Sequence, residues 1–325
     1  MNAPSELLGP SRAVSAPHAL HAHDRDFRET NCYVDMVIEL VHALGLEPTA
    51  CLGFPIASDF EGDQWTFIKP ATSDLDRLYG IGIEELCLWR PLVLHVEEQL
   101  RRGRIPLVEV DSHFLPDTQG SDYRARHAKT SIAITHMDTV GKTLRYFHNA
   151  GCFELSGPDF DGTLGVGDHA PLLPPYTEIV KLDRCVQLDP QTLRARSREL
   201  ARGYLDRRPR ANPITAYAAR MAEHLAWIRT GGFDAYHAYS FASVRQLGSA
   251  FELLASYARY LDAGANGSCA RAAEQAATIS TTAKAMILRL ARVANSGRTF
   301  DASETMATMA RAWNECMQHL EDALA

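Results

Sequence analysis

Apolar residues recur at helical spacing along the second half of the chain. They lie on one side of a helix over residues 214–228, 244–261, 279–293 and 306–320. Asn212-Pro213 is a typical helix start ahead of the first stretch, and Gly231-Gly232 is a typical stop after it. Four amphipathic helices with short connections predict an all-α helical bundle domain over residues 190–325.

A further helical stripe lies near the start of the chain. Its apolar residues are Val34, Val37, Ile38, Val41 and Leu44. Thr30 or Asn31 is a suitable N-cap, so Cys32 falls in the first turn of this helix. Gly45 is expected to end the helix.

Between these helical regions the pattern changes to strands. Residues 105–111 have the composition of a strand, and residues 130–138 and 143–149 are expected to form a hairpin around Val140-Gly141. A two-residue turn at that point would place Asn149 opposite Ile132. Asn149 would then share a face with Thr130.

Shorter signals complete the first half of the chain. Residues 73–79 and 91–102 are expected to be helical, and the Pro- and Gly-rich run 157–175 is expected to lead out of this region. The mixed pattern predicts an α+β domain over residues 27–189. Residues 1–26 lack periodicity and are expected to form a flexible tail.

Charge divides unevenly along the 325 residues, whose net charge is −7. Residues 1–189 carry 16 Lys and Arg against 28 Asp and Glu, whereas residues 190–325 carry 17 against 12. An acidic first half argues against nucleic acid as a partner of the whole protein. The basic second half favours an acidic partner, with Arg194, Arg198 and Arg202 as candidate contacts, although an arginine-rich helix face is commonly only solvated.

The cysteines and histidines give little sign of metal or disulfide chemistry. Seven scattered cysteines contain no C-x-x-C pair, so no disulfide framework or structural zinc is expected. His18, His21 and His23 could bind a metal, but a solvated tail is the preferred interpretation, and no bound metal or cofactor is expected. Because neither a secretory signal nor a membrane-length apolar run occurs, a cytoplasmic location without membrane contact is expected.

Cys32 is the strongest candidate for chemistry. In the first turn of a helix, a thiol lies at the positive end of the helix dipole, which favours the nucleophilic thiolate. The alternative is a small buried apolar side chain, which is the interpretation preferred for the other six cysteines.

A nucleophilic thiolate needs a base, and the base needs an orienting group. Papain-like enzymes present cysteine on a helix, then histidine, then Asn or Asp on strands, and this chain offers Cys32, His127 and Asn149 in that order. His113 is the second candidate base. Asp111 could orient the base or bind a substrate amine, and it could equally pair with a nearby basic side chain.

Several of these motifs also resemble known families. The runs 108–116 and 123–127, followed by an apolar strand, are similar to acyltransferases of the butirosin-biosynthesis type, whose papain-like domain is related to bacteriocin-processing peptidases. More closely, Asn31-Cys32, Asp117-Thr118, His127–Thr130 and Tyr146–Gly151 resemble an uncharacterised bacterial family associated with amino acid:carrier-protein ligases. The resemblance covers roughly residues 27–165.

The resemblance implies a papain-like fold for the first domain, with Cys32 as nucleophile, His127 as base and Asn149 as orienting residue. It implies an enzyme that takes an acyl or aminoacyl group from the phosphopantetheine thioester of a carrier protein and passes it to an amine. Two positions depart from the family patterns. Thr130 stands where the butirosin type has a second histidine, and Asp26 replaces the oxyanion glutamine of papain-like enzymes, which leaves that role to Asn31 or to backbone N–H groups.

Two alternatives remain open from the sequence. The first is a papain-like cysteine peptidase or amidase, which would cleave amides without a carrier protein. The second is a non-catalytic adaptor that binds a carrier protein and forms no acyl-cysteine.

Overall fold

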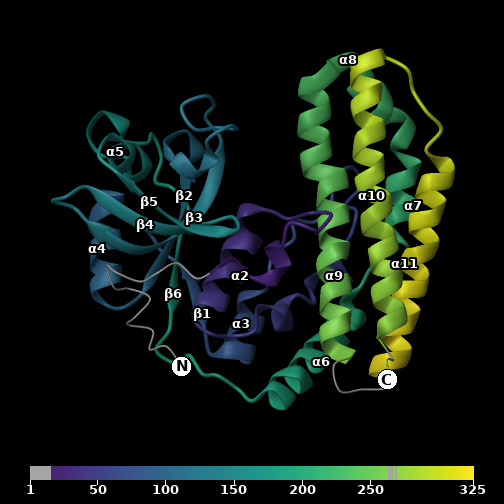
Figure 1. Cartoon of the computed structure of the whole chain (residues 1–325), viewed down its shortest axis with the longest axis horizontal. Coiled ribbons are helices and arrows are strands. Elements are labelled where there is room, and N and C mark those ends of the chain that lie inside the picture. Colours follow the sequence, from purple (N-terminus) through teal and green to yellow (C-terminus); the bar gives the residue numbers. More distant parts are fainter. Residues whose placement is uncertain (1–15, 263–266, 268) are drawn as a thin grey trace. The chain divides into compact units, whose positions relative to one another are not determined.

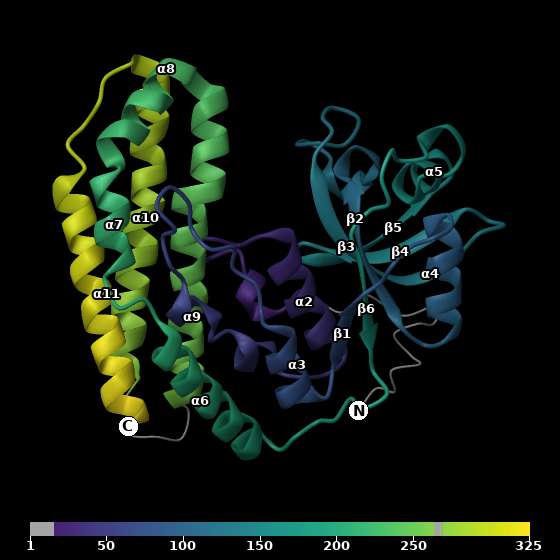
Figure 2. The same cartoon turned by 180° about the vertical axis from the view of Figure 1, so that it is seen from behind.

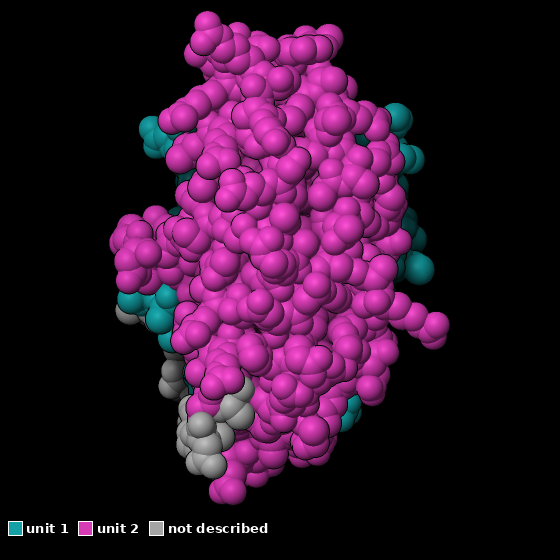
Figure 3. Space-filling model, turned by 90° about the vertical axis from the view of Figure 1, so that its right-hand side faces the viewer, with its two compact units in different colours: residues 1–21, 31–48, 71–188 teal, residues 22–30, 49–70, 189–325 magenta. Residues whose placement is uncertain are grey.

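The computed structural model describes residues 16–262, 267 and 269–325, and these residues form two compact units. We call residues 1–21, 31–48 and 71–188 the sheet unit, and residues 22–30, 49–70 and 189–325 the helical unit (Figure 3). The predicted domain boundary at residue 189 therefore lies where the last segment of the sheet unit ends and the main segment of the helical unit begins. Residues 22–30 and 49–70 nevertheless pack with the helices.

The sheet unit is built on one six-stranded antiparallel sheet (Figure 1). Its strand order is β1-β6-β2-β3-β4-β5. The strands are β1 (Gly82–Glu85), β2 (Ile105–Asp111), β3 (Lys129–Asp138), β4 (Thr143–His148), β5 (Gly151–Ser156) and β6 (Thr177–Lys181). The α+β prediction is confirmed at this level.

Helices cover the two faces of this sheet. They are α2 (Cys32–Ala43), α3 (Thr72–Tyr79), α4 (Leu92–Arg101) and α5 (Pro158–Leu164). Val108, Ile132 and Tyr146 share a buried cluster with residues of α4 and α5. Successive strand residues point to opposite faces, so Leu107 lies on the other face. There α2 packs against β3, β4 and β5, and Tyr33 bonds to Glu178, the cross-strand neighbour of Leu107.

The prediction for α2 is confirmed in detail. The side chain of Asn31 accepts a hydrogen bond from the backbone N–H of Val34 at 3.0 Å, which satisfies a donor of the first turn. Gly45, with φ of +77°, follows the last turn in the left-handed conformation that glycine adopts without strain. Cys32 is the first residue of α2, in agreement with the prediction that it lies in the first turn.

The observed register of the hairpin differs from the predicted one because β3 contains a β-bulge. Four residues connect Asp138 to Thr143, and the pairing shifts between Ile134 and His136. Ala133 therefore pairs with Phe147, and the predicted pairing of Asn149 with Ile132 is wrong by one residue. Side chains alternate between the two faces of a sheet, so a shift of one residue changes the face. Asn149 therefore falls opposite Ser131, and not on the face of Thr130 as predicted.

The run 157–175 is more structured than expected. It contains α5 and a 3-10 turn at Gly167–His169, and it leads into β6, which lies inside the sheet between β1 and β2. Neither β6 nor the short edge strand β1 was among the elements predicted from the sequence.

Residues 16–26, expected as part of a flexible tail, are packed. Leu20 and His21 are buried, and the backbone N–H groups of Asp26 and Phe27 donate to the carboxylate of Glu252. Residues 1–15 of the expected tail lie outside the described residues.

The helical unit contains the predicted bundle (Figures 1 and 2). Its helices are α6 (Pro190–Arg207), α7 (Pro213–Ala219), α8 (Met221–Tyr239), α9 (Gln246–Asp262), α10 (Ala270–Ser296) and α11 (Ser303–Leu324), with a π-helical segment at Ser240–Arg245. The central helix α10 packs against α8, α9 and α11. Gly231-Gly232 interrupts the helix as predicted, since Gly232 has non-helical φ of 61° and ψ of −143°, and a second helical stretch of α8 follows this kink up to Tyr239.

Two segments from the first half complete the core of the helical unit. Trp65 packs edge-on against Tyr217 of α7, with ring centroids 5.5 Å apart. The hydroxyl of Ser197 donates to the carbonyl of Ala50 at 2.8 Å. These contacts explain why residues 49–70 belong with the helices. In the described part of the chain, no helix combines the length and apolarity needed to cross a membrane.

Candidate functional site

The Cys32 thiol lies at the N-terminus of α2 and is partly exposed. The positive end of the helix dipole is therefore at this thiol. No acceptor within the described residues takes the backbone N–H of Cys32, which leaves a donor beside the sulfur. A backbone N–H in this position can stabilise an oxyanion that forms on a carbonyl attacked by the thiol.

A second group lies where β2 ends and β3 begins. The carboxylate of Asp111 lies 2.5 Å from Nδ1 of His127, and its other oxygen accepts the backbone N–H of His113 at 3.0 Å. His127 is largely exposed, with 71% of its side chain accessible. When Nδ1 carries the proton that Asp111 accepts, Nε2 is free to act as a base toward a ligand.

Aromatic contacts fix the surroundings of His127. The rings of His113 and His127 stack with centroids 4.2 Å apart and planes 10° apart. Phe114 meets His113 edge-on and also contacts His169. Gly162 of α5 lies directly against the Phe114 ring, because a Cβ atom there would come within 2.2 Å of it. The His127 imidazole is therefore packed against the His113 ring on one side and exposed to solvent elsewhere.

The strand pattern places α2 and the Asp111 group on the same face of the sheet. Leu107, Glu109 and Asp111 alternate along β2 and project to one side. That side carries Glu178, which bonds to Tyr33, the residue after Cys32. Within the described residues, no hydrogen bond links the Cys32 thiol to an imidazole.

Asn149 does not act as the partner of His127 in this structure. It lies in the turn between β4 and β5 with a φ of 45°, and the hydrogen-bonded position on His127 is occupied by Asp111. Asp111, predicted as a supporting residue, therefore takes the orienting position. The side-chain oxygen of Asn31 caps α2 by accepting from Val34, and the oxyanion role predicted for Asn31 or for backbone N–H groups stays a prediction.

Thr130 and His148 belong to a separate buried network. Nε2 of His148 lies 2.7 Å from the Thr130 hydroxyl, and Nδ1 lies 2.5 Å from Asp117. The Tyr146 hydroxyl donates to the other oxygen of Asp117 at 2.5 Å. Burial and the nearby carboxylate raise the pKa of Tyr146 well above its usual value. The side chains of His148 and Asp117 are 2% and 3% exposed, so this group is part of the core.

Sequence reasoning missed a buried carboxylate near the start of α2. Glu178 of β6 is 4% exposed, and its two oxygens accept the hydroxyls of Tyr33 and Tyr176, both at 2.7 Å. Burial, followed by the charge of Glu178, raises the pKa of Tyr33. The alternation of Tyr176 and Glu178 was the available signal, but the run before it was expected to be a loop.

The three candidate partner-binding arginines donate to helix ends. Arg194 and Arg198 bond to the carbonyls of Tyr260 and Leu261 at the end of α9, at 3.1 and 3.3 Å. Arg198 also bonds to the carbonyl of Ala323, and Arg202 to that of Leu324, both at 2.6 Å, at the end of α11. Cations at these positions complement the negative end of the helix dipole. An acidic partner stays a prediction.

Two of the three N-terminal histidines, His18 and His21, make contacts within the sheet unit, and His23 is exposed. His21 is buried between two carboxylates of α2, with Nδ1 2.5 Å from Glu39 and Nε2 3.3 Å from Asp35. His18 lies 4.0 Å from Glu47. No set of three or more His, Cys, Asp or Glu side chains within the described residues is arranged to hold a metal ion.

All seven cysteines are free thiols, and burial separates them chemically. Burial raises the pKa of Cys152 to about 11 and that of Cys316 to about 12. A thiol with such a pKa is almost entirely protonated near neutral pH, which makes both residues poor nucleophiles.

Comparison with known proteins identifies the chain by family. Residues 16–182 match the DUF1839 N-terminal domain, and residues 190–322 match the DUF1839 C-terminal domain. Comparison with curated proteins finds no match. The two matched regions cover most of the chain and meet near the start of α6, and the chain therefore belongs to the DUF1839 family.

Proposed function

We propose that this protein is a cysteine-dependent acyl or aminoacyl transferase with a papain-like sheet unit. The observation that carries the proposal is the pairing of two elements on one sheet face. Cys32 begins the helix that packs on this face, and an exposed His127 is oriented by Asp111 at the end of β2. A nucleophile at a helix N-terminus and an imidazole held by a carboxylate are the parts of a cysteine acyl-transfer site.

The reaction would run in two balanced steps. Nε2 of His127 takes the proton of the Cys32 thiol, and the thiolate attacks the carbonyl carbon of a carrier-protein thioester. The carbon–sulfur bond to the phosphopantetheine thiol breaks, that thiol leaves with a proton, and the acyl group stays on Cys32. An amine then attacks the acyl-cysteine, its proton passes to His127, and the Cys32 thiol is released.

A thioester donor suits the geometry better than an amide. A thiolate leaves without help, whereas an amide nitrogen must be protonated as it departs, which requires an acid aligned with the scissile bond. Because no hydrogen bond joins Cys32 to an imidazole within the described residues, the less demanding donor is favoured over the peptidase or amidase alternative.

The lack of a hydrogen bond between the Cys32 thiol and an imidazole within the described residues makes the non-catalytic adaptor the second candidate. A protein that binds a carrier protein without chemistry needs no contact between thiol and base. The adaptor predicts carrier binding that survives Cys32→Ala and produces no acyl-enzyme.

The test is an incubation with aminoacylated carrier protein, followed by intact mass measurement. We expect an acyl adduct on the wild type and on Cys152→Ala, a matched control that removes a different thiol of the sheet unit. Cys32→Ala should show no adduct. Carrier binding without an adduct or loss of thioester in the wild type would replace the transferase with the adaptor.

A further inference from the structure

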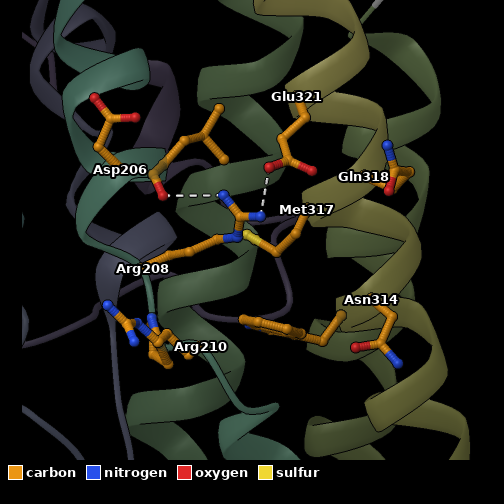
Figure 4. A pocket seen from close by; sticks show the side chains of 10 residues that line it. Asp206, Arg208, Arg210, Asn314, Met317, Gln318 and Glu321 are labelled. Atoms are coloured by element: carbon orange, nitrogen blue, oxygen red, sulfur yellow. Dashed lines mark hydrogen bonds and ion pairs between the residues drawn. The ribbon is translucent and has the colours of Figure 1, made fainter.

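The charged groups that line the cavity between the end of α6 and α11 balance one another. They are two arginines and two carboxylates, Arg208, Arg210, Asp206 and Glu321 (Figure 4). The Arg208 guanidinium already donates to Glu321 and to the carbonyl of Leu205 (Figure 4). This cavity therefore favours neither an anion nor a cation, whereas the sheet unit exposes an apolar segment beside its candidate site.

Residues 170–175 form an exposed connection between α5 and β6, which we call the strap (Figure 1). Its sequence is Ala-Pro-Leu-Leu-Pro-Pro, and Leu172 and Leu173 are 97% and 74% exposed. The backbone N–H groups of these two leucines have no acceptor within the described residues. A segment with few packed contacts and few backbone hydrogen bonds opens at low cost in free energy.

Two glycines directly before the strap are suited to a hinge. Gly165 and Gly167 have φ of +64° and +63°, in the left-handed conformation that glycine adopts without strain. Residues at the end of an element often absorb the backbone rotation that moves a lid. The strap itself is stiffened by Pro171, Pro174 and Pro175, because each proline fixes its own φ. Its motion is therefore concentrated at the hinge.

The first end of the strap contacts the support of the candidate base. The ring of His169, directly before the strap, meets the Phe114 ring edge-on with centroids 5.1 Å apart. Phe114 in turn meets the His127 ring edge-on, with centroids 6.5 Å apart. The strap therefore begins two aromatic contacts away from the exposed imidazole.

The second end of the strap contacts the support of the candidate nucleophile. The hydroxyl of Tyr176, directly after the strap, donates to one oxygen of Glu178 at 2.7 Å. The other oxygen of Glu178 accepts from Tyr33, the residue after Cys32, also at 2.7 Å. The strap therefore connects the side chains that support His127 to those that support the start of α2.

We infer that the strap closes over the acyl group carried by Cys32, with Leu172 and Leu173 against that group. The inference rests on the proposed function, in which Cys32 is the nucleophile and His127 the base. Closure removes the two leucines from water, which is favourable only if the group beneath them is also apolar. The site would therefore select acyl or aminoacyl groups with apolar side chains, and the closed strap would shield the acyl-cysteine from water.

Alkylation of Cys32 tests this closure without depending on acyl transfer. N-Hexyl iodoacetamide joins an apolar chain to the sulfur with loss of iodide, and iodoacetamide forms the same linkage without the chain. Proteinase K cleavage between Leu172 and Leu173, followed by intact mass measurement, reports the fraction of open strap. We expect the hexyl group to slow this cleavage by about tenfold, which corresponds to an open fraction of about one tenth. Iodoacetamide should leave the cleavage rate unchanged.

Cys32→Ala is the matched control, because both reagents can still modify the exposed Cys87 in this variant. Peptide mapping establishes that Cys32 carries the label in the wild type. Equal cleavage of hexyl-labelled and unlabelled wild type would overturn the inference, as would the same protection in Cys32→Ala. Protection by the hexyl group supports closure whether or not the carrier-protein incubation yields an acyl adduct. Failure of the strap and failure of the transferase therefore give different results.

Discussion

The sheet unit contains two histidine–aspartate pairs with the same separation and opposite surroundings. His127 lies 2.5 Å from Asp111, and His148 lies 2.5 Å from Asp117. The first imidazole is 71% exposed and the second 2% exposed. His148 has both ring nitrogens occupied by protein groups, whereas His127 keeps one for a ligand. The same histidine–aspartate contact therefore occurs in two settings, one open to solvent and the other part of the core.

The largest expected effect concerns the exposed pair. Because His127 is the proposed base, His127→Ala should slow acyl-enzyme formation by about 10²–10⁴-fold. Quenched-flow mass measurement with the aminoacylated carrier protein would report this rate. His136→Ala, at a histidine of β3, the strand that follows His127, is the matched control and should keep the wild-type rate. A normal rate in His127→Ala would remove this residue from the proposed mechanism.

The buried pair should dominate stability. Asp117→Ala leaves the His148 imidazole and the Tyr146 hydroxyl without their acceptor inside the core, and a loss of about 3–5 kcal/mol in unfolding free energy is expected. Asp111→Ala breaks an exposed pair and should cost less than about 1 kcal/mol. Urea unfolding of both variants measures the contrast. Equal losses of unfolding free energy in the two variants would show that burial does not make the His148–Asp117 pair more important for stability than the His127–Asp111 pair.

A third imidazole, that of His21, is buried like His148, and its contacts make the stability of the protein depend on pH. Burial alone would lower its pKa, but the hydrogen bonds that its ring N–H groups donate to Asp35 and Glu39, together with the charges of these carboxylates, outweigh this and raise the pKa to about 9. A folded-state pKa above the unfolded value of 6.5 stabilises the protein fully below pH 6.5, and this contribution is lost as pH rises through 9.

The expected size of this contribution is about 2–3 kcal/mol. It is measured as the fall in unfolding free energy between pH 6.5 and 9.5. His21→Asn should be less stable than the wild type at pH 6.5. Its unfolding free energy should decrease much less between pH 6.5 and 9.5 than that of the wild type. An unchanged pH dependence in His21→Asn would assign the titration to another group.

The smallest effect is expected for the ion pair beside His127. Lys129 lies 2.6 Å from Glu109, and its side chain is 73% exposed. Lys129→Ala should change the unfolding free energy by less than about 0.5 kcal/mol and leave acyl-enzyme formation intact. A large loss of activity in this variant would mean that the whole strand end, and not only the histidine pair, contacts the substrate.

The sequence predicted the elements whose signals are local. The stripe and cap of α2 and the strand at 105–111 each depend on residues close together in the chain, and both are present in the structure. The four apolar stripes of the bundle are also helical, but the first, 214–228, is divided between α7 and α8 at Arg220. Cys32, Asp111, His113 and His127 were selected in the same way, from their places at element ends.

Features that depend on distant residues were not predictable. The bulge between Ile134 and His136 changes the partner of every later residue in the hairpin, and nothing local marks it. The pairing of His148 with Asp117 joins positions 31 residues apart. Residues 49–70 pack with helices that follow more than a hundred residues later, so no local pattern could assign them to the helical unit.

The arginines of α6 have a consequence for how the helical unit opens. Helix ends normally fray first, and their amides exchange with solvent through small local openings. Arg198 bonds at once to the last turn of α9 and to the last turn of α11, so neither end can fray without releasing the same guanidinium. The final turns of these two helices should therefore exchange their amide hydrogens as one cooperative group, at a rate that tracks the opening of α6.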